Sequence, residues 1–226
     1  MSSFDLGLIL RVITSPNSAF SQIKDNPERY FSQSIGLFIF SSVLGILIVL
    51  PFVLVPLDDV YLEYIDDTGN MDSIPSEELD VIWYVGLNLL NGFISVALIY
   101  FIGKKLGGEA NWIKVFSVIF HTNAVAIPMI IILSILIFFM WDSLISIEPT
   151  YLLEPDVNDE EILSSLGPLI GYAALLVIVG IGFMVWLIVI LVKAVKIVHG
   201  FETGKAFGLV VLVMIITTIV TIPLSS

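Results

Sequence analysis

Five apolar stretches dominate the sequence, and each is long enough to cross a lipid bilayer, for which about 20 residues suffice. Backbone N–H and C=O groups cannot stay unpaired in hydrocarbon, so a spanning segment must be a helix or part of a closed barrel. The stretches are continuously apolar and lack the strict alternation of barrel strands. The sequence therefore predicts an all-α, polytopic membrane protein, with five transmembrane helices in a compact bundle. The predicted spans are residues 34–57, 81–102, 112–141, 166–192 and 206–223.

The composition supports this class. Apolar residues make up 58% of the 226 residues and charged residues only 13%, whereas soluble domains carry fewer apolar and more charged residues. Nucleic-acid binding requires a basic face, and nine Lys and Arg against 21 acids argue against it. The chain has no cysteine, which excludes disulfides and thiolate chemistry.

The basic residues predict the orientation, because all of them fall on one side. The loops 58–80 and 142–163 contain nine and seven acids, together sixteen of the 21, and no Lys or Arg. The basic residues are Arg11, Lys24 and Arg29 before the first span, Lys104, Lys105 and Lys114 between the second and third, and Lys193, Lys196 and Lys205 between the fourth and fifth. Segments rich in Lys and Arg stay in the cytoplasm. We therefore predict a cytoplasmic N-terminus and an extracytoplasmic C-terminus.

Residues 1–30 are predicted to form a cytoplasmic interfacial segment ahead of the membrane domain, residues 31–226. Large apolar residues recur at spaced positions there, as in an amphipathic helix. Ser15-Pro16 is typical of a helix start, and Asn26-Pro27 is typical of a helix end. One or two short helices in the membrane interface are expected, and the alternative is a flexible soluble arm.

Two glycine-containing turns are predicted on the cytoplasmic side. Gly107-Gly108 provides a position that tolerates positive φ between the second and third spans. A related turn, VHGFETGKAF, joins the fourth and fifth spans. The turns are interpreted either as ordinary helical hairpins with snorkelling lysines or as a surface that binds anionic headgroups or a protein partner. The candidate binding residues are Lys104, Lys105, Gly107, Gly108, Lys114, Lys196, His199, Gly200 and Lys205.

A polar niche is predicted between the second and third spans. Asn91 lies about 16 residues before the Gly107-Gly108 turn and Asn123 about 15 after it, so the two belong at a similar depth. One interpretation is interhelical hydrogen bonds of about 0.5–2 kcal/mol each. The other is a niche that contacts a solute, a lipid headgroup or a metal. The candidate niche residues are Asn88, Asn91, Ser117, His121 and Asn123.

No metal, cofactor or catalytic residue is predicted. A histidine without carboxylate or thiolate neighbours makes a poor metal site. The acids around Gly69 do not follow the order of an EF-hand, so solvated negative loops are expected. Nucleophile elbows, HExxH motifs and phosphate loops do not occur. The sequence therefore favours a protein without enzymatic activity.

Three segments resemble the Yip1 domain family of five-span membrane proteins: SPNSAFSQIKDNPERYF (15–31), IGKKLGGEANWIKVFSVIFHTNAVAIP (102–128) and WLIVILVKAVKIVHGFETGKAF (186–207). They occur in family order and at family spacing. The resemblance implies the same five-helix topology with a cytoplasmic N-terminus. Eukaryotic members are associated with vesicle traffic and with small lipid-anchored GTPases. We do not carry GTPase binding over, because the start of this chain is short and apolar rather than long and rich in Pro, Gly and Tyr.

These observations favour a non-enzymatic membrane scaffold or adaptor of Yip1 type. Its basic glycine turns would present a surface to anionic lipid headgroups or to a protein partner, and a homo-oligomer is possible. The alternative is a small, oligomeric channel or transporter for a cation or small solute, which would use the polar niche as its path. Five spans without an inverted repeat are few for an alternating-access transporter.

The predicted orientation can be tested by single-cysteine labelling, since the chain has no native cysteine. A membrane-impermeant thiol reagent added to intact cells should label Asp66→Cys and leave Lys104→Cys unlabelled, because only the first lies outside. Labelling of Lys104→Cys with Asp66→Cys protected would reverse the topology. Permeabilised cells, in which both variants should react, provide the control.

Overall fold

The computed structural model describes residues 5–48, 81–145 and 159–221. The predicted outer loop 58–80, and residues 146–158 of the second outer loop, lie outside the described residues. The chain divides into two compact units. The first comprises Met1–Gly45, Val81–Met129 and Phe183–Ser226, and the second comprises Ile46–Asp80 and Ile130–Gly182.

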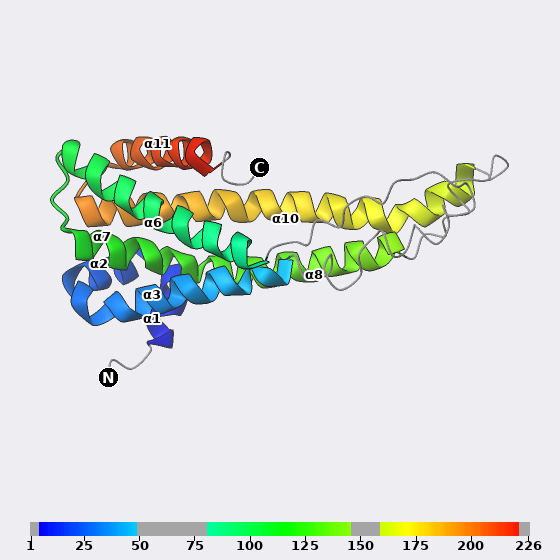
Figure 1. Ribbon diagram of the computed structural model, residues 1–226, viewed down its shortest axis with the longest axis horizontal. Helices are drawn as coiled ribbons and strands as arrows, with labels where there is room; N and C mark the ends of the chain where they lie inside the picture. The colour runs from blue at the N-terminus through cyan, green and yellow to red at the C-terminus, as the bar shows by residue number, and fades with distance from the viewer. Residues whose placement is uncertain (1–4, 49–80, 146–158, 222–226) are drawn as a thin grey trace. The chain divides into compact units, whose positions relative to one another are not determined.

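The described residues are helical apart from short turns, and no strand occurs among them (Figure 1). In chain order the elements are α1 (Leu6–Thr14), α2 (Pro16–Asp25), α3 (Pro27–Leu44), α6 (Val81–Lys105), α7 (Trp112–His121), the 3-10 turn η2 (Thr122–Ala124), α8 (Ala126–Ile145), α10 (Asp159–His199) and α11 (Thr203–Thr221). Five segments are long and apolar enough to span a membrane: Pro27–Ile48, Val85–Lys105, Trp112–Leu144, Leu166–His199 and Thr203–Val220. The predicted class, an all-α membrane protein with five spanning helices, is confirmed.

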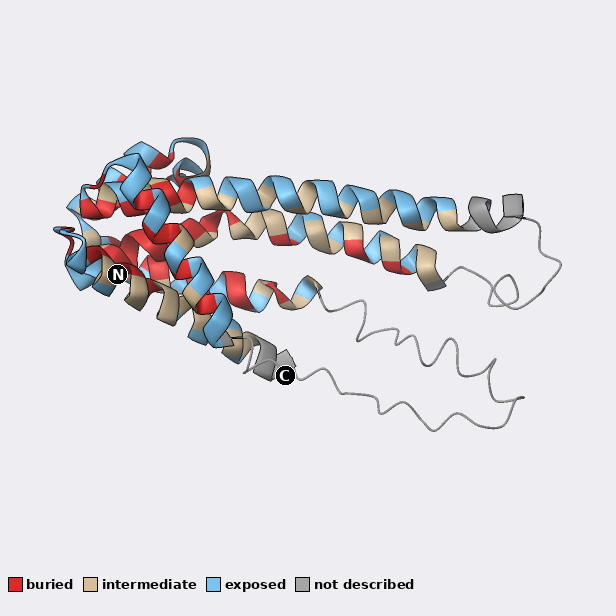
Figure 2. Cartoon of the chain, turned by 90° about the horizontal axis from the view of Figure 1, so that it is seen from above, coloured by how far each residue is buried: buried red, intermediate tan, exposed pale blue. Residues whose placement is uncertain are grey.

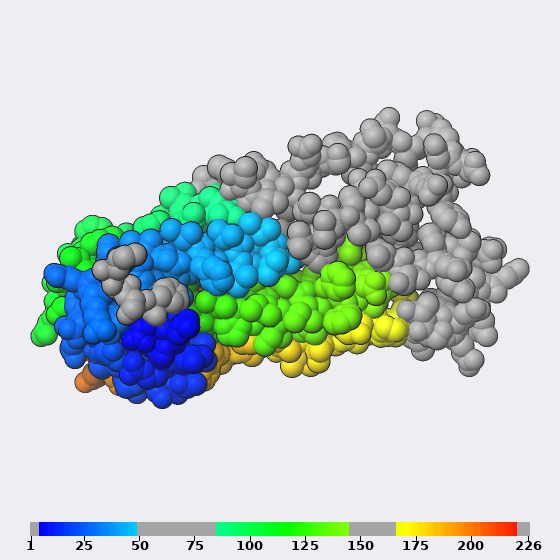
Figure 3. Space-filling model, turned by 90° about the horizontal axis from the view of Figure 1, so that it is seen from below, coloured from blue at the N-terminus to red at the C-terminus, as the bar shows by residue number. Residues whose placement is uncertain are grey.

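Two short helices precede the first spanning segment. The Asp5 side chain accepts a hydrogen bond from the Leu8 N–H at 2.9 Å and so caps α1. Helix α2 begins at Pro16, where a missing N–H costs nothing, and Asn26 is its C-terminal cap. Both helices bury an apolar face: α2 lies against α1 and α7, and its Phe20 and Ile23 are fully buried. Figure 3 shows these helices, in blue, beside α3 in lighter blue.

The first spanning segment begins at Pro27 rather than at the predicted residue 34. Proline fits the first turn of α3, and the helix runs without a break to Leu44, so the polar residues after Pro27 continue into the apolar stretch. Hydroxyl groups along α3 are satisfied by their own helix. Ser34 donates to the Phe31 carbonyl at 2.7 Å, and Ser42 donates to the Phe38 carbonyl at 2.9 Å.

The third spanning segment breaks one turn before Pro128. Helix α7 ends at His121, the 3-10 turn η2 follows, and α8 starts at Ala126. Pro128 has no N–H, and its ring crowds the carbonyl of Ala124, four residues earlier. The irregularity therefore falls on Thr122–Ala124 rather than on the proline itself. Thr122 compensates by donating its hydroxyl to the Ile119 carbonyl at 2.6 Å.

The core of the first unit is built around an aromatic cluster. The rings of Phe38 and Phe120 are stacked with centroids 4.2 Å apart, and Phe93 and Phe116 meet Phe120 edge to face. These rings come from α3, α6 and α7. Gly92 of α6 leaves room for the Phe38 ring, since a Cβ at this position would overlap it. Figure 2 shows the buried residues, in red, concentrated where the helices of this unit converge.

The second unit contains α8 from Ile130 onward and α10 as far as Gly182. Phe139 and Tyr172 stack with centroids 5.8 Å apart. Large apolar side chains on both helices are nevertheless exposed, among them Ile135 at 51% and Ile178 at 68%. Exposed apolar surface of this extent suits contact with lipid.

Gly92→Ala should destabilise the protein, because its methyl group would meet the Phe38 ring, and that ring is held by its stack on Phe120. Overpacking of this kind costs about 1–3 kcal/mol. Gly86→Ala on the same helix is the control, since nothing lies within 4 Å of a Cβ there. Thermal unfolding in detergent should show a lower midpoint for Gly92→Ala only. Equal midpoints would contradict the tight α3–α6 contact.

Candidate functional site

The two predicted glycine turns lie at the ends of long helices, and each uses one glycine in the left-handed region. The turn between α6 and α7 has Gly107 at φ +87°, and the turn between α10 and α11 has Gly200 at φ +72°. Residues with a Cβ rarely adopt this conformation. Gly200 ends α10 after His199, seven residues beyond the predicted end of the span at residue 192.

The His199 side chain joins the two turns. It is 2% exposed, and a Cβ built on either Gly103 or Gly108 would overlap its ring. The His199 carbonyl lies 3.5 Å from the Glu109 N–H of the other turn. Its ring also stacks on Phe201, with centroids 5.1 Å apart. The imidazole therefore fills a slot that glycine alone leaves open, and it holds the turns together.

Lys205 makes a second link between the turns. Its ammonium group donates a hydrogen bond to the Leu106 carbonyl at the end of α6. The same ammonium lies 4.6 Å from the centroid of the Phe201 ring, within reach of a cation–π interaction. Lys205 thus supplies a hydrogen-bond donor to one of the carbonyls that have no partner within the helix at the C-terminus of α6.

The remaining cations of the site are mostly exposed. Lys104, Lys105 and Lys196 are exposed, and Lys114 is half-buried. Lys196 donates to the Thr203 hydroxyl at 2.9 Å. All nine Lys and Arg lie in the described part of the chain, and none of them forms an ion pair with a described carboxylate. The structure thus joins the two candidate turns through His199 and Lys205, and the turns also carry the exposed acids Glu109 and Glu202.

The predicted niche residues do not form one hydrogen-bonded group. Asn88 is exposed on α6, and the buried Asn91 Oδ1 has no hydrogen-bond partner among the described residues. Asn123 instead faces α3, where its Oδ1 accepts a hydrogen bond from the Ser41 hydroxyl at 3.4 Å. Its amide group donates to the Phe120 carbonyl at 3.1 Å. Asn123 therefore connects the third spanning segment with the first rather than with the second.

Ser117 and His121 face the start of α3. The Ser117 hydroxyl donates to the Pro27 carbonyl at 3.1 Å. The His121 ring is fully buried, with Nδ1 2.7 Å from the Ser117 carbonyl and the Tyr30 ring edge-on at 6.2 Å. These contacts bind α7 to the start of α3. Sequence reasoning missed Tyr30 as a neighbour, because only tertiary packing places it there.

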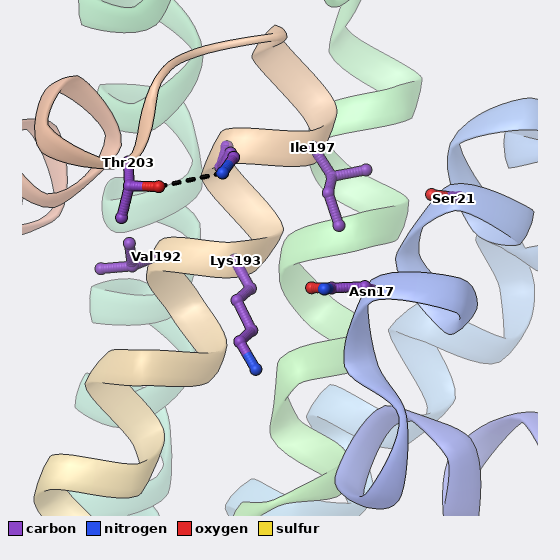
Figure 4. Close-up of a pocket in the computed structure, with 7 residues that line it drawn as sticks. Asn17, Ser21, Val192, Lys193, Ile197 and Thr203 are labelled. Carbon is purple, nitrogen blue, oxygen red and sulfur yellow. Dashed lines mark hydrogen bonds between the residues drawn. The ribbon is translucent and has the colours of Figure 1, made fainter.

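Lys193 was not among the candidate binding residues that the sequence predicted. It lines a pocket of about 350 Å³ together with Lys196 of α10, Asn17 and Ser21 of α2, and Thr203 of α11 (Figure 4). Its spacing of three residues from Lys196 places both lysines on one face of α10, which is a signal in the sequence. No group of His, Asp or Glu among the described residues is arranged to hold a metal ion.

Gly108→Ala should destabilise the joined turns, because the added methyl group would meet both the His199 ring and the Gly103 carbonyl. The expected loss is about 1–3 kcal/mol of unfolding free energy. Gly204→Ala, where nothing lies within 4 Å of a Cβ, is the control. A cysteine at Phe201 should react faster with a thiol reagent in the Gly108→Ala background than in the control. Equal reactivity and stability would show that His199 does not join the turns.

Comparison with known proteins bears on the whole chain. The family model described as the Yip1 domain matches residues 10–224. No curated protein matches the chain, and no solved structure does. The match covers nearly all of the described helices, including both turns, α2 and the second half of α1, and it confirms the resemblance seen in the three sequence segments. This chain therefore belongs to the Yip1 domain family of integral membrane proteins.

Proposed function

We propose that this Yip1-domain protein is a non-enzymatic membrane scaffold whose basic turns bind anionic lipid headgroups or a protein partner in the cytoplasm. The observation that supports this proposal is the joining of the two turns by His199, which holds two lysine-bearing turns next to each other. We also propose the orientation that the charges predict, with the N-terminus cytoplasmic and the C-terminus outside.

The cations of this surface are available for an external anion. They form no ion pair with a described carboxylate, and most are exposed. Each Lys near a negatively charged membrane surface contributes about 1 kcal/mol of attraction. A rigid turn loses little conformational freedom when it binds, which favours recognition by preorganisation.

The proposal also agrees with the position of the histidine in the turns. His199 is the one histidine of the turns, and its ring is enclosed by the two glycines and Phe201, so no substrate reaches it. General acid–base catalysis requires hydrogen-bond contact with the reacting group. The imidazole acts here as a packing element.

Charge reversal at Lys104 and Lys105 tests the proposal. The double variant Lys104→Glu/Lys105→Glu should lose most of its binding to phosphatidylserine-containing liposomes or to a cytoplasmic partner in pull-downs. Each lysine removed should lower the affinity for the membrane about fivefold, so the affinity of the double variant should fall at least 25-fold. Lys104→Arg/Lys105→Arg keeps the charges and should bind like the wild type.

Two results would count against the proposal. Unchanged lipid co-purification together with unchanged pull-down profiles of the charge-reversed variant would show that the surface binds neither class of partner. Solute-selective flux in liposomes that His121→Ala abolishes would instead support a channel.

A further inference from the structure

The pocket between α2, α10 and α11 has the chemistry of a phosphate site. Its polar groups are the two ammonium groups of Lys193 and Lys196, the Asn17 amide and the hydroxyls of Ser21 and Thr203. All of these groups can donate a hydrogen bond, and the pocket contains no carboxylate. Figure 4 shows Asn17 pointing toward α10 across the pocket. An anion with several acceptor oxygens suits such a set of donors.

No carboxylate in the described part of the chain forms an ion pair with either lysine. The two lysines lie one turn apart on α10, and like charges at this spacing repel. Lys196 donates to the Thr203 hydroxyl, and Lys193 has no hydrogen-bond partner among the described residues. Glu202, next to Thr203, is exposed and forms no ion pair with either lysine. The pocket therefore offers unneutralised positive charge to a ligand.

The backbone adds to this potential. Thr203 is the first residue of α11, a helix of 19 residues. The N-terminus of a helix carries partial positive charge and unpaired N–H groups, which favour anions. Lys193 and Lys196 on the neighbouring helix and Asn17 and Ser21 on α2 surround this end from independent parts of the chain.

The location indicates that the phosphate belongs to a lipid. Lys193 is the first charged residue after the apolar run 166–192, so it marks the depth at which hydrocarbon gives way to headgroups. Val189 and Val185 precede it at intervals of four, on the same helix face, and are 38% and 56% exposed. Val192 and Ile197 provide apolar wall in the pocket itself. An acyl chain would lie along the valines while its phosphate occupies the pocket.

We propose that this pocket binds the phosphate group of one anionic phospholipid of the cytoplasmic leaflet. The lipid's phosphate contacts Lys193 and Lys196, and its polar headgroup meets Asn17 and Ser21 of α2. Bound there, the lipid fastens α2 to α10. The inference rests on the proposed function, because it names the lipid class for one part of the same cytoplasmic face.

The test counts lipids that stay bound to the full-length protein. The protein is placed in phosphatidylcholine nanodiscs that contain an increasing fraction of phosphatidylglycerol. Native mass spectrometry then measures how many lipid molecules remain bound after the protein is released from the nanodisc. The wild type should retain one phosphatidylglycerol molecule in a saturable manner. Lys193→Gln/Lys196→Gln should weaken this retention about 25-fold, from about fivefold for each lysine. Arg11→Gln/Arg29→Gln, which removes the same charge outside both the pocket and the two turns, should retain the lipid.

A second pair of variants separates the pocket from general charge. Ser21→Met fills the pocket without changing charge and should also lose the retained lipid. Ser18→Met, an exposed serine on the same helix that does not line the pocket, should keep it. Circular dichroism and the thermal midpoint confirm that each variant is folded.

Three results would overturn the inference. The first is equal retention of phosphatidylcholine and phosphatidylglycerol. The second is unchanged retention in both pocket variants. The third is complete displacement of the lipid by millimolar inorganic phosphate, which would assign the pocket to a soluble anion. The proposed function is tested separately by the charge-reversed Lys104/Lys105 variant. If only that variant loses liposome or partner binding, the proposed function is supported. If it binds unchanged while the pocket still retains its lipid, the proposed function is wrong and the lipid site is unaffected.

Discussion

The packing of one imidazole ring against two glycines is the contact on which the end of this protein that carries both glycine turns depends. His199 occupies space that exists only because Gly103 and Gly108 lack side chains. The ring brings the end of α10 to the end of α6, and it thereby fixes the starting points of α7 and α11 as well. Tight backbone approach through small residues is a general means of helix association in membranes, where hydrophobic burial gives little driving force between helices.

From this contact follows the distribution of charge. Each turn alone contributes a few lysines at the end of a helix, which is common at membrane surfaces. Once joined, the turns bring lysines of both hairpins to one end of the first unit, where Lys205 satisfies a carbonyl of the other turn and Lys104 and Lys105 are exposed. Polar residues deeper in the first unit serve packing. Ser117 and Asn123 link the third spanning segment to the first, and Asn88 stands apart from them.

The N-terminal helices have two connections to this arrangement. Phe20 and Ile23 of α2 are buried in the first unit, which secures α2 beside α7. On its other side α2 contributes Asn17 and Ser21 to the pocket with α10 and α11. Membership of the Yip1 domain family, shown over residues 10–224, includes most of these two helices. Most of both helices therefore lies within the region that matches the domain. The same helix α2 packs against α7 and lines the pocket with α10 and α11.

The sequence by itself determined the class of protein and its five spans, because unpaired backbone groups are too costly in hydrocarbon for any other structure of such apolar stretches. It also indicated both glycine turns and the helix boundaries at Ser15-Pro16 and Asn26-Pro27, since these signals are local in the chain. Only the tertiary structure decided which side chains meet. Counting residues from the turn placed Asn91 and Asn123 at a similar depth, yet Asn123 is hydrogen-bonded to Ser41. The count gives the position of a residue along the helix axis, but it does not give the direction in which the side chain faces around that axis. The contact of His199 with Gly103 and Gly108 joins residues about 90 positions apart, and no local pattern specifies such a contact.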